Sequence, residues 1–249
     1  MPLNINGNII NSGIAKVANY KSISTRGLIM ALEAGAAESL PETGTTWSDM
    51  VGSYNGSLTN GAAYDSTGGG SVYFDGTDNY VGFSNTTNTL QGLYTATMSM
   101  WVKLSRKGGG GNQFQQVAGW RDDGDSNFFF LLLDNSGASV NTEVRINTNL
   151  GSNYDINVDF TSYFGSWTNV VVSVDTSRID LYLNGSLAGS NTNKTGYFGT
   201  SNELRIGQNL STSWTALGYI ANFAIYNRAL SLAEVQQNYN AQKGRFGIL

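Results

Sequence analysis

The chain of 249 residues contains no cysteine and no histidine. Without cysteine, the fold needs no disulfide bond and no oxidising compartment. Without histidine, the chain lacks the commonest general base at neutral pH and the commonest protein ligand for metals. Catalytic sites of the Ser-His-Asp and Cys-His types and histidine-based zinc sites are therefore excluded.

Proline and charged residues are also scarce: the chain has two prolines, and Asp, Glu, Lys and Arg together make up 13% of it. The formal net charge is −4 and no basic stripe is present, so we expect no nucleic-acid partner. No run of about 18 apolar residues is present, and we expect no membrane partner. The N-terminus lacks the apolar core of a signal peptide, which predicts synthesis in the cytoplasm.

Glycine and aromatic residues are plentiful, with 31 Gly, 13 Tyr and 11 Phe. This composition favours short strands joined by polar turns. Residues 95–104 alternate strictly, which predicts a strand with Ala96, Met98, Met100 and Val102 on one face. Proline, which cannot donate a backbone hydrogen bond to a neighbouring strand, is nearly absent. The chain is therefore predicted to be all-β.

Two local motifs add detail to this prediction. Asn184-Gly185 accepts the positive φ angles of a tight turn and predicts a hairpin. Ser71 to Phe83 predicts two strands around Asp75-Gly76. Ser231 followed by Glu234 fits a capping box that opens a short helix through about Gln242, with Gly244 as its stop.

The chain divides into two parts by composition. Residues 1–26 are rich in asparagine and only weakly alternating, and we interpret them as an N-terminal arm. A partly ordered tail and a docking arm that adds a strand to a neighbour are both consistent with this composition. Residues 27–249 are predicted to form one β-sandwich.

Six segments, in order along residues 28–245, resemble laminin-G-like members of the concanavalin A-like lectin/glucanase superfamily. They are Gly44 to Asp49, Gly70 to Val81, Met98 to Lys103, Trp167 to Val172, Leu181 to Gly185 and Ile220 to Ser231. The resemblance implies a jelly roll of two antiparallel sheets. The arm and the tail Gln236 to Gly247 are also similar to such domains in structural proteins of tailed bacteriophages, notably those of marine cyanobacteria.

The glucanases of this superfamily carry Glu-x-Asp on one strand, where alternation brings both carboxylates to the same face. None of the six glutamates of this chain has an aspartate two residues later. We therefore predict that the protein is not an enzyme. A pair of carboxylates that converge from separate strands would not be recognised by this spacing.

Calcium is the ion that the resemblance implies, and the aspartates in the matching segments are Asp49, Asp75 and Asp78. Related sequences carry an acidic pair in the closing strand, where this chain has Ala221-Asn222. This difference weakens the expected site. Simple turn chemistry is the alternative explanation for Asp75-Gly76.

Aromatic side chains are the candidates for sugar binding. Trp101 and Trp167 lie in strand patterns and are expected to pack inside the sandwich. Trp120, Tyr197 and Trp214 lie near loop ends beside polar residues, and we predict that they form an exposed carbohydrate-binding surface.

Two functional hypotheses follow. The first is a non-catalytic bacteriophage virion protein, either a capsid decoration subunit or a fibre subunit, docked on other capsid or tail proteins through the arm. It predicts self-association, for example as a homotrimer, residence in the virion, and a further capacity to bind host-surface glycans. The alternative is a soluble, lectin-like carbohydrate-binding module, which predicts a monomer with a defined sugar site.

Overall fold

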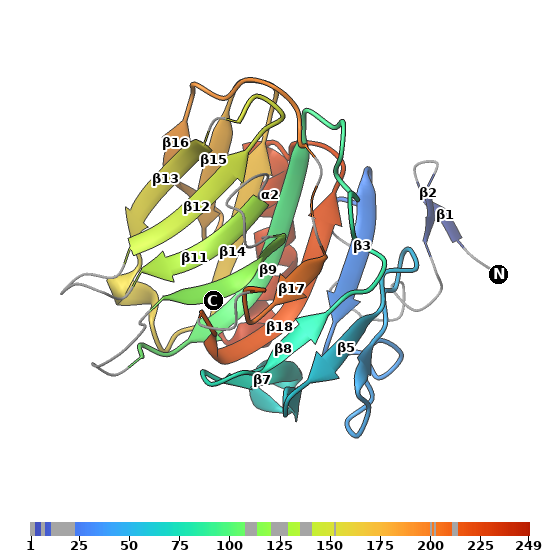
Figure 1. The fold of residues 1–249 in the computed structure, drawn as a ribbon. Helices are drawn as coiled ribbons and strands as arrows, with labels where there is room; N and C mark the ends of the chain where they lie inside the picture. The colour runs from blue at the N-terminus through green and yellow to red at the C-terminus, as the bar shows by residue number, and fades with distance from the viewer. Residues whose placement is uncertain are drawn as a thin grey trace.

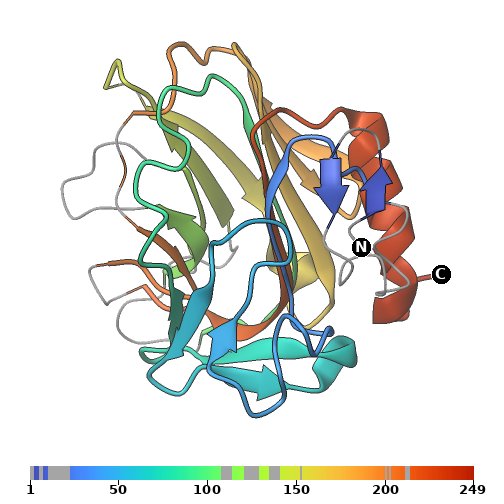
Figure 2. The same ribbon diagram turned by 90° about the vertical axis from the view of Figure 1, so that its right-hand side faces the viewer.

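The structure, a computed structural model, describes residues 3–5, 8–10, 23–107, 114–120, 129–134, 141–151, 153–199, 201, 203–210 and 214–249. Two antiparallel sheets face each other, and a helix near the C-terminus stands outside them (Figures 1 and 2). The prediction of an all-β sandwich with one short C-terminal helix is confirmed. No helix in this described part of the chain is long and apolar enough to cross a membrane.

The first sheet, sheet I, has eight strands. In spatial order they are β13 (Asn153–Asp159), β12 (Asn141–Asn147), β11 (Phe129–Asp134), β10 (Gln115–Trp120), β17 (Leu204–Ile206), β8 (Tyr80–Gly82), β5 (Gly56–Thr59) and β4 (Thr46–Trp47).

The second sheet, sheet II, has seven strands in its main path. In order they are β16 (Ser186–Asn191), β15 (Ile179–Leu183), β14 (Thr168–Val174), β9 (Ala96–Leu104), β18 (Leu217–Tyr226), β7 (Ser71–Asp75) and β6 (Ala63–Asp65). Strand β3 (Leu28–Glu33) also pairs with β18. The short 3-10 helices are η2 (Thr67–Gly69), η3 (Thr161–Tyr163) and η4 (Lys243–Phe246).

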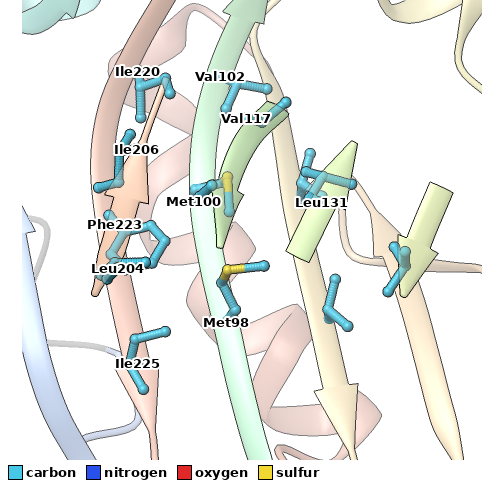
Figure 3. Packing of buried hydrophobic residues seen from close by; sticks show 14 of the residues in the cluster. Met98, Met100, Val102, Val117, Leu131, Leu204, Ile206, Ile220, Phe223 and Ile225 are labelled. Carbon is cyan, nitrogen blue, oxygen red and sulfur yellow. The ribbon is translucent and has the colours of Figure 1, made fainter. Parts of the chain in front are cut away.

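The core lies between the sheets and follows the alternation of β9. Met98, Met100 and Val102 are fully buried and point toward the apolar side chains of sheet I (Figure 3). Opposite them, Val117 of β10 and Leu131 of β11 close the core from the other side. The predicted inward face of residues 95–104 is confirmed.

Trp101 does not lie between the sheets. It is fully buried, but it sits on the outer face of sheet II, where its ring stacks on Tyr239 and Phe246 at centroid distances of 5.6 and 4.2 Å. The expectation that Trp101 packs inside the sandwich is therefore wrong in detail. The C-terminal segment covers this face, so both faces of the strand are buried there.

The covering helix, α2 (Leu232–Gln242), begins with the predicted capping box. Ser231 Oγ accepts a hydrogen bond from the Glu234 N–H, and the Glu234 carboxylate accepts one from the Ser231 N–H. The α-helix ends at Gln242, as predicted, but Gly244 does not end the helical turns. The helix tightens into η4, and the chain turns at Gly247, whose φ of 72° is left-handed.

Two predicted turns are confirmed in position. Asn184 and Gly185, with φ of 51° and 76°, connect β15 to β16. Strands β7 and β8 flank the Asp75-Gly76 turn, but they belong to different sheets. The chain crosses from sheet II to sheet I at this turn, which the local sequence pattern does not reveal.

The N-terminal residues form a separate pair of strands, β1 (Leu3–Ile5) and β2 (Asn8–Ile10). Among the described residues, these two strands pair only with each other. The chain then joins the sandwich at Ser24, whose N–H donates to Asn238 Oδ1 and whose hydroxyl donates to Glu234. Most of the predicted arm, residues 11–22 included, lies outside the described residues.

Candidate functional site

The outer face of sheet I carries polar and aromatic side chains near the middle of the sheet. Leu204 and Ile206 of β17 are fully buried in the core, so Arg205 between them points away from it. The residues directly opposite Arg205 on the neighbouring strands are Gly82 and Gly119. Because Gly82 has no side chain, the Tyr80 ring can lie over this position and against the guanidinium group.

Arg205 is held flat and in place by neutral groups. Its guanidinium carbon lies 4.3 Å from the centre of the Tyr80 ring, within the range of a cation–π contact. Its Nη1 donates to Gln208 Oε1 at 3.2 Å and to the Asn209 carbonyl at 3.3 Å. A side chain at position 82 would crowd this arrangement, because a Cβ there would lie 3.0 Å from the Tyr80 ring.

Gln116 continues this surface on β10. Its side-chain Nε2 donates to the Gln208 carbonyl at 3.3 Å, and its Oε1 is buried without a hydrogen-bond partner among the described residues. Phe114, two residues earlier, contacts Trp214 with ring centroids 5.0 Å apart. A buried polar atom left unpaired costs about 1–3 kcal/mol, so it marks a place where stability has not been maximised.

We define these residues as the Arg205 patch: Tyr80, Phe114, Gln116, Arg205, Gln208 and Trp214. Tyr80, Phe114, Arg205 and Trp214 are half-buried, whereas both glutamines are buried beneath. Aromatic faces offer apolar contact area with a fixed orientation, and the guanidinium offers planar donors. The patch can therefore bind a flat, hydroxyl-rich molecule.

The three predicted sugar-binding aromatics are not brought together. Trp214 belongs to the Arg205 patch and is half-buried. Trp120 is 2% exposed in the core and donates from Nε1 to the Thr86 carbonyl, so the prediction that it is exposed is wrong. Tyr197 packs against the Tyr94 ring at 5.6 Å and accepts the Asn149 N–H, and its described contacts do not reach the patch.

Asp49 does not fit a calcium ligand. Its Oδ1 accepts the N–H groups of Ala31 and Val51, and its Oδ2 accepts those of Gly52 and Tyr54, at 2.9 to 3.2 Å. Both oxygens therefore already accept backbone hydrogen bonds, from the loop after β4 and from Ala31 of β3. Such fixed backbone contacts give this carboxylate a structural role.

Asp75 and Asp78 are simpler turn residues. Asp75 Oδ1 accepts the Thr77 N–H at 2.7 Å, and the Asp78 carbonyl accepts from Asn60 Nδ2 at 3.3 Å. In the described ranges, no three Asp or Glu residues gather into a group that could hold a metal ion. Calcium binding at Asp75 and Asp78 stays a prediction from the family resemblance.

Sequence reasoning missed most of the Arg205 patch. Tyr80, Gln116, Arg205 and Gln208 are not among the candidates that the sequence analysis names. A weak signal exists: Arg205 is a charge inside the short alternating run Leu204 to Ile206. Its glycine neighbours become visible only once the strand register is known.

The fold and this open polar face define a lectin-like sandwich. A sequence model described as the Concanavalin A-like lectin/glucanases superfamily matches residues 75–236. The chain belongs to this superfamily, as the ordered segments indicated. No curated protein matches the chain in sequence.

Solved structures share the fold at low sequence identity. The binding domain of botulinum neurotoxin serotype D is 15% identical with a TM-score of 0.63, over 87% of this chain and 52% of that one. This chain therefore spans about half the length of that domain. Domain 4 of the arabinanase AbnA from Geobacillus stearothermophilus, solved with arabinotriose, is 19% identical with a TM-score of 0.60, over 85% and 98%.

A Trypanosoma rangeli sialidase in complex with the inhibitor DANA is 14% identical with a TM-score of 0.64, over 92% of this chain and 36% of that one. The three proteins include binding domains and an enzyme, so the fold alone does not separate these functions. What the comparisons establish is the fold of the concanavalin A-like lectin/glucanase superfamily.

Proposed function

We propose that the protein is a non-catalytic glycan-binding protein and that the Arg205 patch holds the sugar. The observation that carries this proposal is the contact of Arg205 with the Tyr80 ring on an outer sheet face that no described helix covers. Trp214 is connected to Arg205 through Asn209, which accepts hydrogen bonds from both residues. Rings of this kind stack on the apolar faces of sugars, and fixed donors select their hydroxyl groups. The arabinanase domain solved with arabinotriose supports the same use of this fold.

The acidic side chains support the absence of catalysis. Glycoside hydrolysis of the retaining type needs two carboxyl groups about 5–5.5 Å apart. Glu33 forms an ion pair with Arg245, and Glu234 forms one with Arg228. The six residues that define the patch include neither Asp nor Glu, and among the described residues Glu203, two positions before Arg205, is a single carboxylate where this reaction needs two.

The test uses the purified full chain on an array of immobilised neutral and acidic glycans, followed by calorimetric titration of the best binder. Trp214→Ala is expected to weaken binding about tenfold or more, because an aromatic contact contributes about 1–2 kcal/mol. Tyr94→Ala is the matched control, since Tyr94 is a 51% exposed aromatic elsewhere. Equal losses in both variants, or no binding to any glycan, would refute the proposal.

A second candidate function is a structural subunit of a tailed-phage virion. We base it on the sequence resemblance and on one observation: β1 and β2 pair only with each other among the described residues. Such a strand pair retains unpaired backbone edges, which a neighbouring protein can extend by strand addition. On this proposal the protein is a capsid decoration or fibre subunit that self-associates as a homotrimer. Residues 1–26 attach it to other virion proteins.

Light scattering of the purified chain and co-sedimentation with cyanophage capsid shells test this second candidate. It predicts a trimer that sediments with the shells. Ile9→Pro, which removes a backbone donor from β2, is expected to abolish sedimentation with unchanged sandwich stability. Ile9→Val is the matched control. A monomer that stays in the supernatant would exclude this role and leave glycan binding intact.

A further inference from the structure

The cationic group in the Arg205 patch lacks the partner that other arginines of this chain have. Four arginines in the described part each form an ion pair with a carboxylate: Arg145, Arg178, Arg228 and Arg245. Arg205, like the exposed Arg26, forms none with a described residue, although acidic residues outnumber basic ones by 18 to 14 in the whole chain. Its contacts are the Tyr80 ring, the Gln208 amide and the Asn209 carbonyl, all of them neutral.

The hydrogen bonds of Arg205 also leave one side of the guanidinium free. Both printed bonds come from Nη1, so Nε and Nη2 donate to no described residue. These two nitrogens form one edge of the planar group, and that edge matches the two oxygens of a carboxylate or a sulfate. The edge is therefore set up for bidentate binding of an anion.

The geometry around Arg205 fixes this edge in advance. Tyr80 holds the plane of the guanidinium, and Gln208 is itself held through its carbonyl by Gln116. A group that is already oriented loses little conformational entropy when a ligand binds. Gly82, opposite Arg205 on β8, has no side chain that would displace the Tyr80 ring from this position.

We propose that the ligand of the Arg205 patch is an acidic glycan whose carboxylate or sulfate binds side-on to Nε and Nη2 of Arg205. This inference rests on the glycan-binding function proposed above and names its chemical class. The Tyr80 and Trp214 rings contact the sugar, while Arg205 selects for the negative charge.

Glu203 offers a second, independent test of an acidic ligand. It lies two residues before Arg205, directly before the first residue of β17. It is half-buried and forms no ion pair with a described residue. Because it carries a negative charge near the bound anion, it opposes binding of an acidic sugar and leaves a neutral sugar unaffected.

The experiment compares charged and neutral forms of the same sugars by calorimetric titration of the full chain. The first pair is tetragalacturonic acid and its carboxyl-reduced form, and the second is a keratan sulfate tetrasaccharide, which has no carboxylate, and its desulfated form. We expect one acidic form to bind about tenfold or more tightly than its neutral form, and the pair that does so tells carboxylate from sulfate. This preference is expected to fall in 0.5 M NaCl.

Variants then assign the preference to Arg205. Arg205→Gln is expected to remove the preference for the acidic form, and Arg205→Lys, which keeps the charge but loses the bidentate edge, to reduce it about tenfold. Glu203→Gln is expected to strengthen acidic binding about two- to threefold. Arg178→Gln is the control, since this exposed arginine lies on the other sheet.

The outcomes separate the two proposals. Equal binding of the charged and neutral forms would overturn the acidic ligand and leave glycan binding standing. Binding that Arg205→Gln and Arg178→Gln weaken equally would overturn the role of Arg205. Absence of binding to any of the four sugars, together with an empty glycan array, would overturn both proposals.

Discussion

The outer faces of the two sheets differ in what lies on them. On sheet II, the Trp101 ring is fully buried under Tyr239 and Phe246 of the C-terminal segment. Figure 2 shows the helix of this segment lying outside the sheets. On sheet I, Tyr80 and Arg205 are half-buried, and no described helix covers them. The covered face adds a second apolar layer that stabilises the sandwich, whereas the open face keeps side chains available for a ligand.

Two arginines show the same contrast. Arg245 reaches from η4 to the buried carboxylate of Glu33 and donates to the carbonyls of Gly68 and Gly70. Arg205 has neutral partners only. Arg245 forms an ion pair inside the protein, whereas the positive charge of Arg205 stays available to a ligand. The predictions below test this difference in order of expected effect.

Arg245→Ala should cause the largest loss of stability. The change leaves the Glu33 carboxylate, with 1% of its side chain exposed, without its cation. Breaking a buried ion pair in this way typically costs about 3–5 kcal/mol. Urea unfolding followed by tryptophan fluorescence measures the loss. Arg178→Ala, at a pair whose arginine is 44% exposed, is the control and should cost under about 1 kcal/mol.

Phe246→Ala should come second, at about 2 kcal/mol. The ring packs on Trp101 at 4.2 Å and on Trp167 at 4.7 Å, and it is itself only half-buried, which places the loss below that of a fully buried phenylalanine. Tyr94→Ala removes an exposed ring and is the comparison. A change in the native tryptophan spectrum should accompany the loss, and its absence would show that Trp101 does not depend on this cover.

Much of the architecture could be predicted from the sequence because short local patterns determine it. The alternation of β9, the Asn184-Gly185 turn and the Ser231 to Glu234 capping box each occupy a few adjacent residues. Trp101 was misplaced because alternation tells which residues share a face, but not whether a distant segment covers that face.

The candidate site was mostly invisible for a related reason. Trp120 was expected to be exposed from its polar neighbours, yet register with Phe129 and Leu204 places it inside the core. The Arg205 patch is assembled from β8, β10 and β17, which are distant in sequence and meet only in sheet I. Strand order and register are long-range properties, and one sequence does not contain them in readable form.

Lowering the pH should have the third largest effect, through the helix that covers sheet II. Hydrogen bonds from Arg228 lower the pKa of Glu234 from 4.5 to about 2. A carboxyl group with a depressed pKa stabilises the fold above its unfolded pKa, and this contribution is lost as the pH falls through the folded pKa. The loss should therefore occur between about pH 4.5 and 2.

Because the Glu234 side chain is 28% exposed, solvent screening limits this contribution to about 1–2 kcal/mol. Urea unfolding of the native chain and of Glu234→Gln at pH 6 and at pH 2 measures it. The two should differ at pH 6 and converge at pH 2. A constant difference at both pH values would mean that packing, rather than charge, accounts for the role of Glu234.

Arg205→Ala should have the smallest effect on stability, under about 1 kcal/mol, because it removes one exposed cation–π contact and hydrogen bonds to neutral groups. It is the matched counterpart of Arg245→Ala in the same urea assay. Binding residues are commonly kept for recognition and not for stability, so a large functional loss with a small structural one is the expected signature. A loss above about 2 kcal/mol would mean that Arg205, like Arg245, mainly stabilises the fold. The outer faces of the two sheets would then not differ in function.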